Sequence, residues 1–175
     1  MEASQIDAHN ELAIVHMALS KCLKNVIEHY QGDLAIDAKR DLGAGEQGTN
    51  KNYSSKITIG GDGVEGTFIV SFLQNDIFMI LSKAFKCAFD EIEEEEAQEF
   101  TSEICNQIFG QFRTHLIALG YQVEMSIPEE VTREEEELLE KSDSKIRNTI
   151  SFGVDASGGQ GAQSGSALKY CLAKI

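Results

Sequence analysis

The chain has 175 residues and a mass of 19.2 kDa, with 42% hydrophobic and 25% charged residues, which is the composition of one domain with its own core. Twenty-nine Asp and Glu against fifteen Lys and Arg give a net charge of −14, so nucleic acid and anionic membrane surfaces are not expected partners. The apolar runs are too short for a membrane span, and the first residues lack the basic and apolar regions of a signal peptide. We therefore expect a cytoplasmic protein.

The cysteines and histidines are not spaced as a metal site. The cysteines lie far apart among apolar neighbours, as is typical of small buried thiols: Cys22, Cys87, Cys105 and Cys171. The histidines also lack ligand spacing: His9, His16, His29 and His115. Glutamates 93–96 and 134–137 fan around a helix axis, which favours solvated faces over an ion site. The sequence predicts neither a metal nor a cofactor of the protein's own.

The first part of the chain predicts a long helix and a strand. Apolar residues recur at spacings of three and four from residue 6 to about residue 30, which describes an amphipathic helix that stops near Gly32. Residues 34–38 alternate like a half-buried strand, and residues 41–54 form a loop rich in Gly, Asn and Ser.

A hairpin and a second helical region follow. Residues 56–59 and 66–72 are β-rich runs, and the glycines of residues 60–63 between them permit the positive φ angles of a tight turn. From about Asn75, an apolar pattern of helical period runs into the acidic block 91–96.

A further helix is predicted from about residue 97 to residue 119, where Gly120 ends it. Residues 121–127 then alternate between apolar and polar side chains as a strand closed by Pro128. Residues 129–144 are mostly charged.

The chain closes on a second hairpin. Residues 147–154 and 167–175 read as two strands around the Gly-, Ala-, Ser- and Gln-rich loop 155–166. The order of helix plus three strands therefore occurs twice. We expect a single domain over residues 1–175 with an α+β fold, in which this internal repeat builds a mainly antiparallel sheet covered by long helices.

The helix at 97–119 carries the most informative residues. At about 100° per residue, its apolar side chains share one broad face: Ile104, Cys105, Ile108, Phe109, Phe112 and Leu116. The opposite stripe holds Glu103, Asn106, Gln107, Gly110 and Thr114. A glycine within a helix costs about 1 kcal/mol relative to alanine. Either these are ordinary surface residues with a glycine that allows tight helix packing, or a partner approaches this stripe closely.

The sequence Glu103-Ile-Cys-Asn106-Gln-Ile-Phe-Gly110, with Pro128 after the following strand, resembles the CheC/CheX/FliY family of chemotaxis phosphatases. The signature of that family is Glu-x-x-Asn with a glycine four residues on. The resemblance is specific over residues 99–131 and architectural over nearly the whole chain. CheC-like members carry two such helices and CheX-like members carry one, so the single copy here is most similar to CheX.

The resemblance implies hydrolysis of the aspartyl phosphate of a CheY-type response regulator, which supplies the phosphoryl group, its Mg²⁺ and a lysine. Asn106 would position the attacking water, because a carboxamide both donates and accepts hydrogen bonds. Glu103 would contact the regulator's lysine. Gln107, Gly110 and Thr114 on the same stripe would contact the partner.

Two other functions fit the sequence. The same helix could recognise a response regulator or a flagellar switch component without accelerating hydrolysis. The terminal strands could pair across a sheet edge in a homodimer, since the last strand, 168–175, is apolar enough to be hazardous as an open edge. The resemblance also implies a dimer, because CheX-like relatives pair through their sheets. A self-contained enzyme is not expected, because the sequence has no phosphate-binding loop, nucleophile elbow or Cys-x5-Arg loop.

Overall fold

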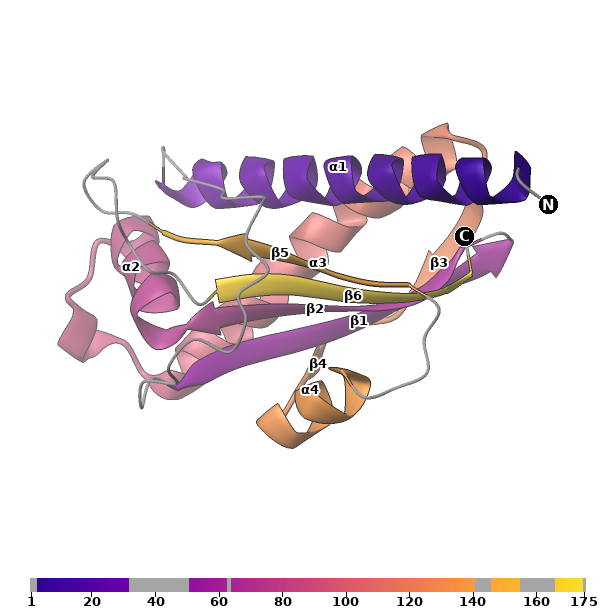
Figure 1. Ribbon diagram of the computed structural model, residues 1–175. Coiled ribbons are helices and arrows are strands. Elements are labelled where there is room, and N and C mark those ends of the chain that lie inside the picture. Colours follow the sequence, from indigo (N-terminus) through magenta and orange to yellow (C-terminus); the bar gives the residue numbers. More distant parts are fainter. Residues whose placement is uncertain (1–2, 32–50, 63, 141–145, 155–165, 175) are drawn as a thin grey trace.

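The computed structural model describes residues 3–31, 51–62, 64–140, 146–154 and 166–174 (Figure 1). Its helices are α1 (Ala3–Gln31), α2 (Gln74–Phe85), α3 (Glu94–Ala118) and α4 (Arg133–Glu140), with a short 3-10 helix, η1 (Phe89–Glu91), before α3. Its strands are β1 (Asn52–Asp62), β2 (Glu65–Leu73), β3 (Gln122–Met125), β4 (Glu129–Glu130), β5 (Ile146–Phe152) and β6 (Ser166–Lys174). The predicted strand 34–38 lies outside the described residues, as do residues 41–50 and 155–165 of the predicted loops.

The strands form one sheet in the order β3-β1-β2-β6-β5, with β4 also paired to β1, and every pairing is antiparallel. The hairpins β1–β2 and β5–β6, one from each half of the chain, meet through β2 and β6. The predicted α+β class is therefore confirmed. The last strand is not left as an open edge, because β6 pairs with β2 on one side and with β5 on the other. β5 is the outermost strand at that end of the described sheet.

Helices α1 and α3 cover one face of the sheet, and the core lies between (Figure 1). Phe68 on β2 packs against Phe109 and Phe112 of α3, with ring centroids 5.0 and 5.7 Å apart. All three side chains have no exposed surface, and each such burial stabilises the fold by roughly 1.5–3 kcal/mol. The apolar face of α3 is thereby committed to the core. None of the helices in the described ranges combines the length and the apolar character needed to cross a membrane.

Both ends of α3 follow from local chemistry. At its start, the Glu96 carboxylate accepts a hydrogen bond from the backbone N–H of Glu93 (3.1 Å), and the acidic first turn complements the helix dipole. This cap begins the helix at Glu94, three residues before the predicted start. At its other end, Gly120 has a φ of 95°, a left-handed conformation that glycine adopts readily, so the predicted stop is confirmed.

The prediction that the second helical region runs into the acidic block is wrong. Helix α2 ends at Phe85, because Lys86 takes a left-handed conformation with a φ of 55°. Phe89 follows in η1 and is 46% exposed, and Phe85 itself is 65% exposed. The apolar pattern beyond residue 85 therefore does not belong to one helix face.

The first hairpin is confirmed, but Gly60 and Gly61 lie within strand β1 rather than in the turn. Gly60 pairs with Glu65, and β1 continues through Gly61 to Asp62, where it pairs with β3. A Cβ at Gly61 would overlap the carbonyl oxygen of Gln122, so this glycine lets β3 approach. Strand β1 also begins at Asn52, earlier than predicted.

Helix α4 lies on the opposite face of the sheet (Figure 1). Its Glu136 is only 7% exposed: Oε1 accepts a hydrogen bond from Ser71 Oγ (2.7 Å), and Oε2 lies 3.3 Å from Lys169 Nζ. The prediction of a solvated face at 134–137 is therefore wrong for Glu136 and right for the other three residues, which are exposed. Residues 93–96 are all exposed, as predicted.

Candidate functional site

The two sides of α3 divide as its sequence predicts. The predicted apolar residues are all buried: Ile104, Cys105, Ile108, Phe109, Phe112 and Leu116. On the opposite side, Glu103, Asn106 and Thr114 are exposed, while Gln107 and Gly110 are half-buried. One helix therefore fixes its core face on the sheet and presents the five predicted site residues along a single exposed strip.

Glu103 is held in place by its neighbour one turn on. The Gln107 amide Nε2 donates to Glu103 Oε1 (2.7 Å) and to the hydroxyl oxygen of Tyr30 (2.8 Å). Tyr30 comes from α1, 77 residues away in the sequence. The predicted site on α3 is thus completed by a residue of another helix, which sequence reasoning missed because nothing local in either segment pairs them.

Asn106 makes no hydrogen bond to any other part of the chain that the structure describes. Its carboxamide borders an open depression of about 430 Å³, lined by Gln98, Glu99, Ser102, Glu103, Asn106, Pro128 and Glu130. The chain after β3 thus brings Pro128 beside the Glu-x-x-Asn helix.

The predicted strand 121–127 ends at Met125, so Ile127 does not face the core but is 79% exposed.

Gly110 is not explained by packing within the described chain. A Cβ built at this position meets no described atom within 4 Å, so the suggestion that the glycine allows tight helix packing is wrong. The Thr114 hydroxyl donates a hydrogen bond to the Gly110 carbonyl oxygen (3.0 Å), so it does not project from the helix surface beside Gly110.

The site is acidic, and no cysteine is among the residues that line it. Glu99, Glu103 and Glu130 line the depression, and no Lys or Arg does, so its field attracts a cation more readily than a phosphate. The nearby Cys105 is fully buried, which raises the pKa of its thiol to about 12 and keeps it neutral. Within the described ranges, no three His, Cys, Asp or Glu side chains gather as a metal site requires. The arrangement can therefore bind an ammonium group and orient a water molecule.

The comparisons with known proteins agree with this fold. The fold is that of the CheC-like proteins: a CheC-like superfamily protein from Shewanella sp. PV-4 superposes with a TM-score of 0.63 at 17% identity, over 90% of this chain and 96% of that one. CheX from Vibrio vulnificus gives a TM-score of 0.62 at 18% identity, over 89% and 96% of the two chains.

A third similar structure is the CheX–CheY–BeF₃–Mg²⁺ complex from Borrelia burgdorferi, with a TM-score of 0.59 at 18% identity, over 89% and 94% of the two chains. The search of curated sequences finds no match. The family model described as chemotaxis phosphatase CheX matches residues 53–151, more than half of the sequence. The chain therefore belongs to the CheX family of chemotaxis phosphatases.

Proposed function

We propose that this protein hydrolyses the aspartyl phosphate of a CheY-type response regulator, with Asn106 positioning the water and Glu103 contacting the regulator's lysine. The observation that carries the proposal is the pairing of Asn106, whose carboxamide is free of the described chain, with Glu103, whose carboxylate is held, at the rim of one open depression. Family membership and the Borrelia CheX–CheY complex support this choice of partner.

The reaction asks for little chemistry from the phosphatase. The water oxygen forms a bond to phosphorus while the bond from phosphorus to the aspartyl oxygen breaks, and the aspartate leaves as a carboxylate. The proton of the water goes to the released phosphate. Charge on the phosphoryl group is balanced by the Mg²⁺ and lysine of the regulator. What remains is to place the water in line, which is the role of the Asn106 carboxamide.

Glu103 suits a lysine contact on electrostatic grounds. Its carboxylate lies near those of Glu99 and Glu130, so an incoming ammonium meets a favourable potential. A charge-assisted hydrogen bond there would fix the register of α3 against the regulator. Gln107, Gly110 and Thr114 would form the adjoining contact surface.

The test times the loss of phosphate from a CheY-type regulator with wild-type protein, with Asn106→Ala and with no protein, and measures binding to the beryllofluoride-activated regulator in parallel. We expect wild-type protein to shorten the phosphate lifetime, and Asn106→Ala to bind without shortening it. If wild-type protein binds and leaves the lifetime unchanged, the protein is instead a non-catalytic binding module.

We also propose that the protein forms a homodimer through its sheet, in the region of the terminal strands β5 and β6. β5 is the outermost strand of the sheet among the described residues, and the end of a sheet is where a second copy of the chain can extend it. Light scattering at micromolar concentration should then give twice the chain mass of 19.2 kDa. A monomer mass under those conditions contradicts this proposal without affecting the assignment of the site.

A further inference from the structure

Helices α1 and α3 are joined by hydrogen bonds beside Glu103. Gln107 of α3 joins Glu103 to Tyr30 of α1 through its two hydrogen bonds. We propose that Gln107 and Tyr30 are positioning residues that hold the Glu103 carboxylate ready for the cation of its partner. The inference rests on the proposed function and adds two residues to it.

The hydrogen-bond chemistry fixes the arrangement. A carboxylate only accepts, so the amino group of the Gln107 amide must face Glu103, and this group has two hydrogens to give. One goes to Glu103 Oε1 at 2.7 Å and the other to the Tyr30 hydroxyl oxygen at 2.8 Å. No described residue donates a hydrogen bond to Glu103 Oε2, so this oxygen can accept one from the partner. The amide thus occupies one carboxylate oxygen and leaves the other available.

Tyr30 is itself fixed by aromatic packing. Its ring lies edge-on to Phe100 of α3, with centroids 5.1 Å apart at 72°, and Phe100 lies edge-on to Phe85 of α2 at 5.7 Å and 70°. Such pairs contribute about 0.5–1.5 kcal/mol beyond their buried area. The Tyr30 hydroxyl is therefore a stationary acceptor rather than a mobile surface group.

Holding the Glu103 side chain in place before the partner binds reduces the conformational entropy that is lost on binding. An exposed glutamate samples several rotamers, and fixing it when a partner binds costs free energy. A side chain already held in one orientation avoids that cost, so the gain is expected in affinity. Asn106 has no such support within the described chain, which suits a side chain that must adapt to a water. Within the described chain, the Glu103 side chain is therefore held in one orientation by hydrogen bonds, whereas the Asn106 side chain is not.

The test uses Gln107→Met, which removes both donors at similar volume, and Tyr30→Phe, which removes only the hydroxyl and keeps the ring against Phe100. Tyr53→Phe is the matched control, because the buried Tyr53 hydroxyl has no hydrogen-bond partner in the described structure. Each protein is titrated with the beryllofluoride-activated regulator and assayed for KM and kcat with the phosphorylated one.

We expect Gln107→Met to raise Kd and KM about three- to tenfold, because one or two hydrogen bonds are lost. The kcat should remain nearly unchanged. Tyr30→Phe should act in the same direction and less strongly, and Tyr53→Phe should have no effect. In a Glu103→Ala background, Gln107→Met should have no further effect, because the group it positions is gone. An equal effect with and without Glu103, or a fall in kcat at constant KM, would overturn the inference.

A measurement on the free protein separates this inference from the proposed function. The side-chain amide protons of Gln107 should exchange with solvent more slowly in wild-type protein than in Tyr30→Phe, as followed by NMR. Equal exchange in the two proteins overturns the positioning pair even if the phosphatase is active. Slow exchange together with Glu103-dependent binding, but no hydrolysis, supports the pair while the phosphatase assignment fails.

Discussion

Gly110 occupies the same exposed strip of α3 as Glu103 and Asn106, and no described atom lies where its side chain would be. Replacing it by alanine removes the helix penalty of glycine without creating a clash inside the chain. Gly110→Ala should therefore stabilise the protein by about 0.5–1 kcal/mol, while the added methyl group on the partner-facing surface should raise KM for the phosphorylated regulator. Thermal unfolding and steady-state assays of the same variant measure both effects.

The control for this prediction is Gly120→Ala. Gly120 also has free space around it, but its φ of 95° is a conformation in which alanine is strained. This variant should lose about 1 kcal/mol of stability and keep its KM. If Gly110→Ala gains stability with no change in KM, the partner does not approach α3 at this position.

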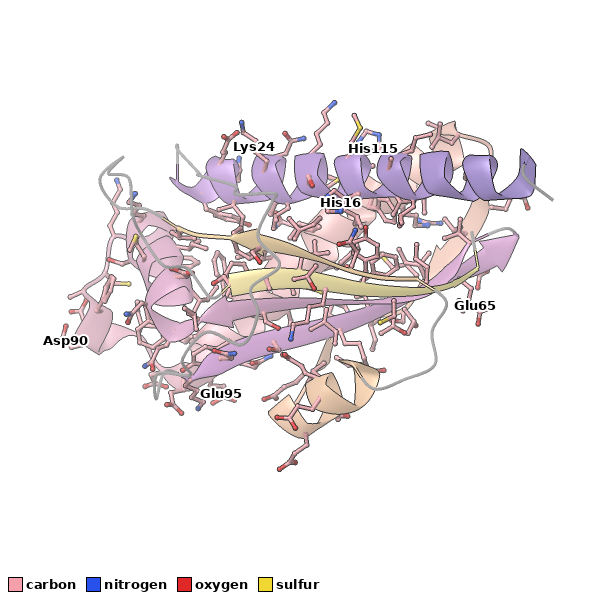
Figure 2. All side chains as sticks on the ribbon, in the orientation of Figure 1. His16, Lys24, Glu65, Asp90, Glu95 and His115 are labelled. Carbon is pink, nitrogen blue, oxygen red and sulfur yellow. The ribbon has the colours of Figure 1, made fainter. Side chains whose placement is uncertain are left out.

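At the scale of elements, His16 links α1 to the sheet, and Figure 2 shows it between the two. Its Nδ1 lies 3.1 Å from the Tyr170 hydroxyl and 3.4 Å from Asn148 Nδ2. Burial raises the pKa of Tyr170 to about 12, so this hydroxyl keeps its proton and is able to donate it, and the amide nitrogen of Asn148 can only donate. Nδ1 is therefore an acceptor, and the imidazole is neutral in the fold. Burial correspondingly lowers the pKa of His16 below its ordinary value of 6.5.

This contact predicts a pH dependence of stability. Below about pH 6.5 the unfolded chain binds a proton at residue 16 that the folded chain does not, so the free energy of unfolding should decrease as the pH falls from 6.5 toward the lowered pKa of His16. Urea denaturation between about pH 7.5 and 5.5 measures this slope. His16→Gln, which can still accept from Tyr170, should reduce the slope, and the exposed His29→Gln should not. Identical slopes in all three proteins would contradict the linkage.

The elements differ in how far the sequence predicts them. The apolar face of α3 and the exposed pair Glu103 and Asn106 follow from helical periodicity, because the signal is local and repeated over six turns. The Tyr30 contact does not follow, since it depends on how α1 packs against α3. The burial of Glu136 is missed for the same reason. The four glutamates of residues 134–137 look alike in the sequence, and which of them contacts Ser71 depends on how α4 packs against the sheet.

For the molecule as a whole, charge sets the conditions of association. The chain carries a net charge of −14, and the depression beside Asn106 is lined by carboxylates, while the aspartyl phosphate of the proposed partner would also be negatively charged. Long-range steering is then weakly unfavourable and is screened by salt. We expect kcat/KM to rise modestly, by less than about threefold, between roughly 0.05 and 0.3 M NaCl. A steep fall over this range would show that attraction between opposite charges dominates the encounter.

In the proposed reaction, the carboxamide of Asn106 positions the attacking water. The most direct measurement is the rate of phosphate loss from a CheY-type regulator saturated with wild-type protein, Asn106→Ala, or Asn25→Ala, which removes the same exposed side chain from α1. We expect a decrease of about 100-fold for Asn106→Ala, with an unchanged Kd, and no change for Asn25→Ala. Equal rates for wild-type protein and Asn106→Ala would contradict it.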